Sequence, residues 1–491
     1  MEENIQQPAG SAAKEQNINP WSVSGEVAED GSVKPIDYNK LVDQFGTKLI
    51  DEALLERFER VTGHKPHRFL RRQIVFSHRD LEVILDRFEK QQPFFLYSGR
   101  GPSSDILHIG HIIPFELTKW LSDVFQVPVI IMLTDDEKYL ISQPDRTIDE
   151  YEAYARENAK DIIAVGLDPE RTFIFSDFEY MGGQFYRNIT RIAKRVNRGT
   201  ADAFFGFDSS TNIGKVHFAA IQAASSFAGS FPFMFGPDSN EIPCLIPCAI
   251  DQDPYFRLTR DVASQLKYAK PSLIHARFLD ALQGPGSKMS ASIESSSILV
   301  RDNPKTILNK INKYAFSGGR ETLEEHREKG GNPDIDVPYQ YLKFFLESDE
   351  ELEQIRQDYK SGKLLTGEIK KKCAEELAKF CTLFQEQRAK VTDQILDHFM
   401  TPRPLLCRGV LSNTLLPSMQ SKSELSKGSV KDPNSKSQAK KMKKLEAINA
   451  KKQLKASGKE ADSMATATVV TLSTKEDKAA SGDTITSGRS P

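Results

Sequence analysis

The sequence contains few cysteines: only five occur among its 491 residues, an odd number spread over a long chain. Small secreted domains held together by disulfides have many closely spaced cysteines, so this class of protein is excluded. We expect reduced thiols in an intracellular compartment. Cys244 and Cys248 have no histidine or further cysteine at the spacing of a zinc site, so we expect core thiols there and no metal site.

Long apolar runs are also absent. No stretch approaches the roughly 20 consecutive apolar residues that a membrane-spanning helix needs. The first residues, through Asn19, are polar and have neither the apolar block of a signal peptide nor the arginine-rich bias of a transit peptide. We therefore expect a cytoplasmic protein that does not bind a membrane.

The formal net charge is only −2, but the charge is unevenly distributed. Residues 421–460 contain 12 lysines and 4 acidic residues, whereas residues 1–420 carry a net negative charge. A lysine-rich tail on an acidic body favours an anionic partner such as nucleic acid, because phosphate neutralisation is the main sequence-independent force in such binding. The alternative is a solvated, solubilising tail, and charge alone does not decide between the two.

The succession of apolar patterns predicts an α/β fold and four segments. Residues 1–31 are polar without periodicity and are expected to be disordered. Over residues 32–302, five short apolar runs at 93–97, 128–133, 172–175, 244–250 and 272–278 alternate with helical stripes at 111–125, 148–165, 184–196, 215–227 and 255–268. This alternation predicts a Rossmann-type parallel sheet preceded by an N-terminal extension. Residues 303–403 show only helical patterns and are predicted to form a second, α-helical domain, followed by a disordered lysine-rich tail at 404–491.

The most informative stretch follows the first expected strand and reads SGRGPSSDILHIGH, ending at His108, Gly110 and His111. A strand, a glycine- and serine-rich turn and then a helix place two imidazoles and several backbone N–H groups at a helix N-terminus, which favours phosphate binding. Gly110 lets a nucleotide approach the backbone closely. After the fifth expected strand, residues 284–292 form a glycine- and serine-rich loop whose Lys288 can neutralise charge on a leaving pyrophosphate. H-x-G-H followed by K-M-S-x-S is the two-part signature of class I aminoacyl-tRNA synthetases.

The resemblance becomes specific when further stretches are added. SGRGPSSDILHIGH, TDDEKYL, FAAIQAASSF, PCAIDQDPYFRLTRDVA, ALQG, KMSAS and AFSGGR resemble the eukaryotic cytosolic tryptophanyl-tRNA synthetases, in register over about residues 19–403. The resemblance implies a Rossmann-type catalytic domain, an α-helical anticodon-binding domain and a homodimer. It also implies that ATP and L-tryptophan form tryptophanyl-adenylate, that Mg²⁺ bridges the phosphate oxygens, and that the tryptophanyl group passes to tRNA(Trp).

The resemblance also implies the roles of individual residues. It gives catalytic roles to His108, His111 and Lys288, ATP contacts to Gly110, Met289, Ser290 and Ser292, and tryptophan contacts to Tyr97, Glu137, Gln252 and Gln283. It places tRNA contacts at Arg320 and Lys370 in the helical domain. The hydroxyl of Tyr97 would accept a hydrogen bond from the indole N–H, while Glu137 and the glutamines would receive the substrate ammonium and carboxylate.

The sequence departs from the patterns at two positions. Met132 stands where the members compared have a glutamine, and a thioether is only a weak acceptor, so a second contact to the indole is in doubt. Ala291 replaces the second lysine of the general loop motif. Arg100 and Lys138 are candidates for supplying the missing charge, and solvated surface charges are the alternative for both.

Three other functions remain open at this point. A tyrosyl-tRNA synthetase shares the fold and the dimer, and the wider H-x-G-H nucleotidyltransferases share the first motif. A catalytically silent relative that binds nucleic acid is the third, although such a protein would not need His108, His111 and Lys288 together.

Overall fold

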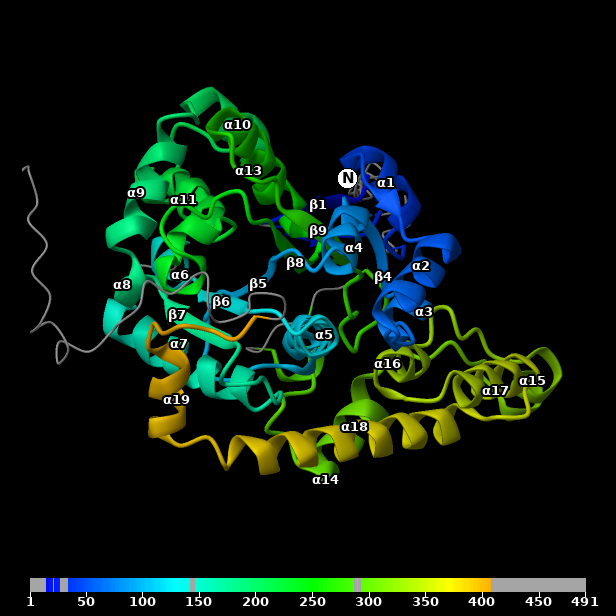
Figure 1. Cartoon of the computed structure of the whole chain (residues 1–491). Coiled ribbons are helices and arrows are strands. Elements are labelled where there is room, and N and C mark those ends of the chain that lie inside the picture. Colours follow the sequence, from blue (N-terminus) through cyan, green and yellow to red (C-terminus); the bar gives the residue numbers. More distant parts are fainter. Residues whose placement is uncertain are drawn as a thin grey trace, which may run out of the picture. The chain divides into compact units, whose positions relative to one another are not determined.

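A seven-stranded mixed sheet forms the centre of the computed structural model (Figure 1). The strand order is β3-β4-β9-β8-β5-β6-β7, and the strands from β9 to β7 are parallel. These five strands are β5 (Phe95–Arg100), β6 (Val129–Leu133), β7 (Thr172–Ser176), β8 (Cys244–Ala249) and β9 (Ser272–Ala276). They coincide with the five predicted strands, and their order confirms the Rossmann-type arrangement.

The structure describes residues 15–20, 22–26, 34–141, 146–286, 289 and 293–407, all within one compact unit of the chain. The lysine-rich segment at 421–460 lies outside the described residues. So do Lys288, Ser290 and Ser292 of the K-M-S-x-S motif.

Two strands at one edge of the sheet were not predicted. β4 (Val75–Arg79) pairs antiparallel with β9, and the short β3 (Lys48–Leu49) pairs antiparallel with β4. The sequence of β4 lacks the apolar pattern of a strand, because its last three residues are Ser77, His78 and Arg79. The first two of these polar side chains are fully buried, which the apolar pattern of a strand does not indicate.

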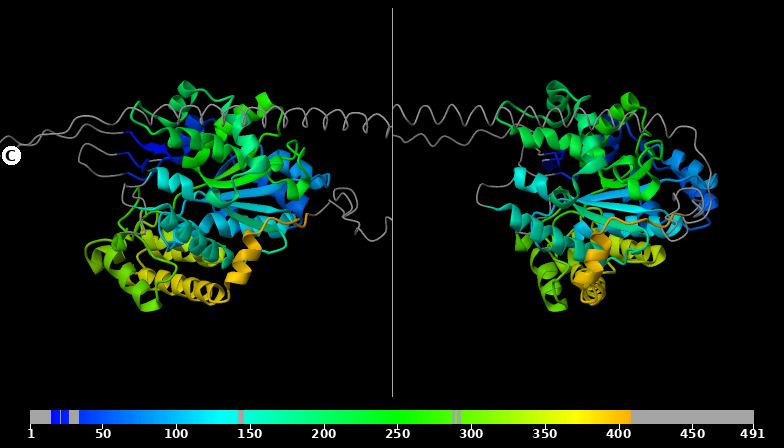
Figure 2. Two further views of the ribbon diagram at one scale, coloured as in Figure 1. Left: turned by 90° about the vertical axis from the view of Figure 1, so that its left-hand side faces the viewer. Right: turned by 60° about the vertical axis from the view of Figure 1, so that its left-hand side comes forward.

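Alternate residues of the parallel strands face two helical layers, as the pleat of a strand requires. Leu96 belongs to the apolar cluster that includes α5 (Ile109–Phe125) and α7 (Ile148–Ile163). Phe95 and Tyr97 belong to the cluster that includes α9 (Gly183–Ala193), α11 (Ile213–Ala224) and α13 (Asp253–Leu266). Figure 2 shows helices on both sides of the sheet. In the part of the chain that the structure describes, no helix has the length and apolar character needed to cross a membrane.

The N-terminal part differs from the expected disorder through residue 31. A hairpin of β1 (Asn17–Asn19) and β2 (Ser22–Ser24) pairs antiparallel, and Ile18 and Val23 join a small apolar cluster with α1. Side-chain packing thus orders a segment whose polar composition suggests a loop. The remaining helices of this half are α1 (Tyr38–Phe45), α2 (Glu52–Thr62), α3 (Arg68–Arg71), α4 (Leu81–Glu89), α6 (Asp135–Ile141), α8 (Asp177–Tyr180), α10 (Arg198–Phe205) and α12 (Pro232–Phe235).

The chain after residue 303 is helical, as its pattern indicates. It forms α14 (Pro304–Tyr314), α15 (Leu323–Lys329), α16 (Val337–Phe345), α17 (Asp349–Lys360), α18 (Thr366–Arg388) and α19 (Asp393–Met400). At the start of helix α14, the Asn303 side chain accepts a hydrogen bond from the Thr306 N–H. Pro304 occupies the first helical position. The apolar cluster of the α5 layer continues into α14, α16, α18 and α19. Because the two predicted domains share this core, the structure does not mark a boundary at residue 302, which stays a prediction. The expected tail begins later than residue 404, because Leu405 is buried and the Leu406 N–H donates to the carbonyl of Glu170.

A buried ion pair fixes the start of α13 against the sheet. The Nε and Nη2 of Arg79 donate to the two carboxylate oxygens of Asp253 at 2.7 and 2.8 Å, and His275 Nε2 lies 3.2 Å from the same carboxylate. Burial alone would raise the pKa of Asp253, but the hydrogen bonds from Arg79 and His275 outweigh it and lower the pKa to about 2. The ionised pair therefore stabilises the fold above about pH 4, and this contribution is lost as the pH falls towards 2.

Replacing Arg79 with methionine should leave the fully buried carboxylate of Asp253 without its guanidinium partner and destabilise the fold by about 3 to 5 kcal/mol at pH 7. The loss should shrink at pH 4, because an unpaired buried Asp253 becomes protonated there. Thermal unfolding at both pH values measures this. Arg198→Met, which removes an exposed ion pair with Asp202 in α10, is the control and should cost less than about 1 kcal/mol. Equal effects of the two variants would contradict the prediction.

Candidate active site

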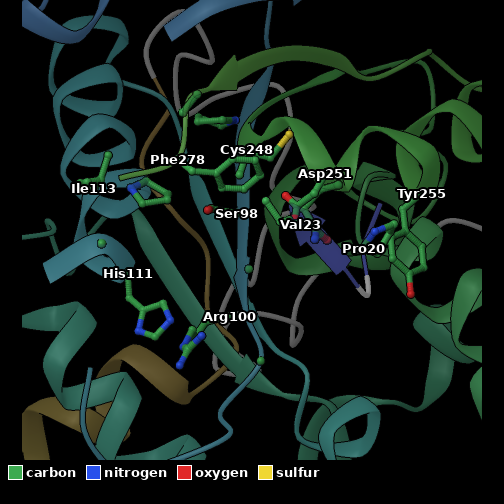
Figure 3. A pocket seen from close by; sticks show the side chains of 18 of the residues that line it. Pro20, Val23, Ser98, Arg100, His111, Ile113, Cys248, Asp251, Tyr255 and Phe278 are labelled. Carbon is green, nitrogen blue, oxygen red and sulfur yellow. The ribbon is translucent and has the colours of Figure 1, made fainter. Parts of the chain in front are cut away.

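A cavity of about 340 Å³ opens where β5 and β8 separate. These neighbouring strands are paired only at Phe95 with Cys244 and at Leu96 with Leu245, whereas β5 continues to pair with β6 through Arg100. The crossovers that follow β5 and β8 lie on opposite faces of the sheet, so the carboxyl ends of the two strands leave a crevice between them. Figure 3 shows the cavity with Arg100 and His111 on one side and Asp251 and Tyr255 on the other.

The two histidines of the H-x-G-H motif lie at the beginning of α5 and line this cavity. Their rings stack with centroids 3.4 Å apart, and the backbone N–H of His108 donates to Nδ1 of His111 at 3.4 Å. His108 is buried, with 6% of its surface exposed. The arrangement places two imidazoles at the N-terminus of a helix, whose dipole favours a phosphate group.

Gly110 brings the two predicted motifs into contact. A Cβ atom at this position would lie 3.1 Å from Nδ1 of His108 and 3.2 Å from Sδ of Met289. Met289, the described residue of the K-M-S-x-S motif, is buried and also lines the cavity. A side chain larger than hydrogen at position 110 would therefore push the motifs apart.

Positive charge stands at the ends of β5 and β6. The guanidinium of Arg100 reaches the cavity, where its Nε donates to Asn158 Oδ1 at 3.2 Å, while its buried Nη2 has no hydrogen-bond partner among the described residues. Burial lowers the pKa of Arg100 to about 10, and the nearby Glu137 opposes this effect. Lys138 forms an ion pair with Glu137 at 3.0 Å. A buried cation with an unused donor favours an anionic ligand at this point.

Neutral groups occupy the inner wall of the cavity. The Tyr97 hydroxyl donates to Sδ of Met132 at 3.2 Å and accepts from Nε2 of Gln222 at 3.0 Å, and the Ser225 hydroxyl also donates to Met132, at 2.9 Å. Since a tyrosine hydroxyl has one proton and two lone pairs, one lone pair of Tyr97 remains for a ligand N–H. Met132 is therefore a partner of Tyr97.

The structure brings most of the predicted residues to the cavity. Its lining includes Tyr97, His108, Gly110, His111, Glu137, Gln252 and Met289. Glu137 accepts from the Thr134 hydroxyl at 2.8 Å, which orients its carboxylate, and Gln252 immediately precedes α13.

Gln283 is an exception, because the structure does not place it in the cavity. It is exposed and donates to the hydroxyl of Ser295 at 3.1 Å. Gln283 lies in a turn that follows the buried Leu282.

The two predicted tRNA contacts lie in the helical part, away from the cavity lining. The exposed Arg320 donates to the carbonyl of Gly330 at 3.0 Å, and Lys370 donates to the carbonyl of Asn312 at 3.2 Å. Burial lowers the pKa of Lys370. Both side chains are thus partly engaged with the protein.

Comparison with protein families matches residues 89–382, more than half of the chain, to the model described as tRNA synthetases class I (W and Y). The chain belongs to this family. Among its relatives are the cytoplasmic tryptophan–tRNA ligases of Schizosaccharomyces pombe, 58% identical over 79% of this chain and 98% of the relative, and of Homo sapiens, 54% identical over 81% and 83%. A solved tryptophanyl-tRNA synthetase of Plasmodium falciparum superposes with a TM-score of 0.70 at 45% identity, covering 75% of this chain and 95% of that one.

Sequence reasoning missed the polar residue that holds Tyr97 in this class I synthetase site. Gln222 lies on α11 with only 8% of its surface exposed and meets Tyr97 inside the cavity. The signal was a lone glutamine among the apolar residues of FAAIQAASSF, because a buried amide in such a stretch needs a partner.

Three buried carboxylates lie close together behind the synthetase cavity. Oxygens of Asp135, Asp136 and Asp177 lie within 4.8 Å of one another, but none of these residues lines the cavity. Asp135 accepts from the Ser176 hydroxyl and from the backbone N–H groups of Asp177 and Phe178. Burial, followed by the charge of Asp136, raises the pKa of Asp177 well above its usual range. The hydrogen bonds to Asp135 fix the turn after β6 against the end of β7.

Proposed function

We propose that this chain activates L-tryptophan with ATP to tryptophanyl-adenylate and transfers the tryptophanyl group to tRNA(Trp). The observation that carries the proposal is the contact of the two motifs, in which Gly110 lies between His108 and Met289 beside a cavity with a neutral inner wall. The relatives that are 54 to 58% identical are named cytoplasmic tryptophan–tRNA ligases, so we also assign the chain to the cytoplasm.

At the phosphate end, a carboxylate oxygen of tryptophan attacks the α-phosphorus of ATP, and the bond from phosphorus to the bridging oxygen of pyrophosphate breaks. His108 and His111 are positioned to donate hydrogen bonds to the phosphate oxygens, and Arg100 offers its unused Nη2 to the same charge. Lys288 is proposed to neutralise the departing pyrophosphate. Catalysis then consists of positioning and charge stabilisation, without a protein nucleophile.

At the amino-acid end, Tyr97 accepts the indole N–H with its remaining lone pair. The carboxylate of Glu137 receives the substrate ammonium, and Gln252 orients the substrate carboxylate. Gln222, which holds the Tyr97 hydroxyl, sets the direction of that lone pair. A phenol ring in place of indole would not offer an N–H to this acceptor, which favours tryptophan over tyrosine.

Mg²⁺ is proposed to enter as the complex with ATP. Arg100 and Lys138, which line the cavity, are cations, whereas Mg²⁺ prefers oxygen ligands and retains several waters. The described residues therefore suit an ion held by phosphate oxygens and water. Bound in this way, it would offset part of the phosphate charge.

The binding of tRNA and the assembly of the chain are also proposals. Arg320 and Lys370 are proposed to contact the anticodon arm from the helical part. A homodimer follows from the family resemblance. It is supported by large apolar side chains on the packed helices α9 and α11, where Tyr186 is 58% exposed and Ile213 is 87% exposed.

Exchange of labelled pyrophosphate into ATP tests the proposed function directly. The full-length chain should catalyse exchange with L-tryptophan and at least about 100-fold more slowly with L-tyrosine, because a site built around one N–H discriminates strongly. Faster exchange with tyrosine would favour the tyrosyl alternative. No exchange with either amino acid would favour the silent nucleic-acid-binding alternative.

Tyr97→Phe should raise the KM for tryptophan in this assay by about tenfold and leave the KM for ATP unchanged, since it removes one buried acceptor. Met132→Gln should be neutral or lower the KM for tryptophan, because an amide oxygen is a stronger acceptor than a thioether. Tyr180→Phe is the matched control, because this hydroxyl donates to the Ser230 carbonyl outside the cavity lining. Unchanged tryptophan kinetics in Tyr97→Phe would show that another group holds the indole.

Deleting residues 408–491 should raise the KM for tRNA and flatten its salt dependence, while exchange without tRNA stays intact. Each lost lysine–phosphate contact should reduce the slope of log affinity against log salt by about 0.7 to 0.9. The cut spares the buried Leu405. Aminoacylation at increasing salt measures both quantities. Identical slopes for the two proteins would make the segment a solvated appendage.

A further inference from the structure

Asp280 connects the end of β9 to the loop that contains the K-M-S-x-S motif. Its Oδ1 accepts a hydrogen bond from the backbone N–H of Gly286 at 3.1 Å, and both residues line the cavity. Gly286 has a φ of +78°, a left-handed conformation that favours glycine. The carboxylate therefore closes a short turn whose last residue can hardly be replaced.

The position of Asp280 is itself fixed from the helical part. The hydroxyl of Tyr341, a fully buried residue of α16, donates to the backbone carbonyl of Asp280 at 2.8 Å. Lys343, two residues further along α16, lowers the pKa of the Asp280 carboxyl through its charge. The other titratable or charged groups that interact with this region are Arg277 on the same segment and Tyr38 of α1, whose hydroxyl accepts from the Phe278 N–H. Asp280 is thus held by one buried hydrogen bond and faces one cation across the helix interface.

The distance along the chain makes this turn relevant to the reaction. Met289 of the K-M-S-x-S motif follows Gly286 by three residues, so the Cα atoms of the two residues cannot lie more than about 11 Å apart. Met289 lies against Gly110 in the cavity. Fixing Gly286 therefore restricts where this part of the motif can lie.

We propose that Asp280 is a positioning residue for adenylate formation, whose ionised carboxylate holds Gly286 and thereby helps to place Met289 of the K-M-S-x-S motif against Gly110. This inference rests on the proposed function. Its carboxylate accepts the N–H of Gly286 in the loop, so Asp280 acts through the loop. The carboxylate binds an N–H more strongly than the protonated acid does, because charge-assisted hydrogen bonds are the stronger kind.

The proposal predicts a pH dependence with a definite sign. Burial raises the pKa of Asp280 to about 6, while the Gly286 N–H and Lys343 act in the opposite direction. Above this pH the carboxylate is ionised and the turn is held, and below it protonation weakens the contact. Because the folded-state pKa is raised, the buried charge costs stability above pH 6, and replacing it with a neutral amide should leave the melting temperature equal or higher at pH 7.5.

Tryptophan-dependent pyrophosphate exchange from pH 5 to 8 tests the proposal with Asp280→Ala and Asp280→Asn. Asp280→Ala should lower kcat/KM for ATP by about tenfold at pH 7.5, the size expected for losing a hydrogen bond to a charged group, without changing the KM for tryptophan. Asp280→Asn keeps a neutral acceptor, which binds the Gly286 N–H less strongly than the carboxylate does, and should recover only part of that loss. It should also lack the decline near pH 6 that the unaltered chain shows. His108 and His111 titrate in all of these proteins, so only the difference between the profiles reports Asp280.

Two further variants separate positioning from a structural role. Lys343→Gln should move the acid limb of the unaltered profile to higher pH, because removing the cation raises the pKa of Asp280. Asp334→Asn is the matched control, because this exposed carboxylate also interacts with Lys343 but is not a partner of Gly286. Its profile should equal that of the unaltered chain.

Unchanged kcat/KM for ATP in Asp280→Ala, or an acid limb that persists in Asp280→Asn, would overturn the proposal. A loss of activity in Asp280→Asn that follows a lower melting temperature would also overturn it, since that result indicates a structural role. If Asp280→Ala does not fold, the pH profile of Asp280→Asn and the shifted acid limb of Lys343→Gln decide whether Asp280 is a positioning residue. Absence of exchange in the unaltered chain would overturn the proposed function and this inference together, whereas normal exchange with unchanged variant profiles would overturn the inference alone.

Discussion

The separation of β5 from β8 after two paired residues is the constraint on which the site depends. The two strands remain hydrogen-bonded to β6 and β9 on their outer sides, so each keeps its direction while the space between their carboxyl ends opens. Tyr97 and Arg100 continue along β5 into this space, and Ile246 and Cys248 line it from β8. Any change that extended the pairing of β5 with β8 would close the cavity even if every side chain of the site stayed the same.

The two ends of the cavity rely on different interactions. The inner wall contains neutral donors and acceptors whose hydrogen bonds are directed by one another, from Gln222 to Tyr97 and from Tyr97 to Met132. The outer end contains the full positive charge of Arg100. Directional neutral contacts distinguish similar rings, whereas charges bind phosphate strongly with little regard to shape. The same crevice can thus recognise an amino acid and stabilise charge on a nucleotide without one task disturbing the other.

The apolar sequence pattern predicted the parallel core because five of its strands are nearly continuous apolar runs. It failed at β4, where Ser77 and His78 are buried by pairing with neighbours and not by their own hydrophobicity. The motifs located the histidines of the site, but no pattern placed Gln222, which needs a helix and a strand to meet. Gln283 was predicted from the family resemblance, but it lies in a turn, where it is exposed and donates to Ser295. Asp280 was not predicted either, because an acidic residue before a loop is common and does not by itself indicate a function.

The apolar cluster of the α5 layer has a consequence for the order in which the protein is made. It joins Ile50 and Phe69 near the N-terminus to Leu396 and Phe399 of α19, more than 300 residues later. A chain emerging from the ribosome can pair the strands of the sheet well before these last helices exist. Until α19 has been synthesised, part of this layer lacks its apolar partners, and the nascent chain carries an uncovered apolar surface that neighbouring chains or chaperones can bind.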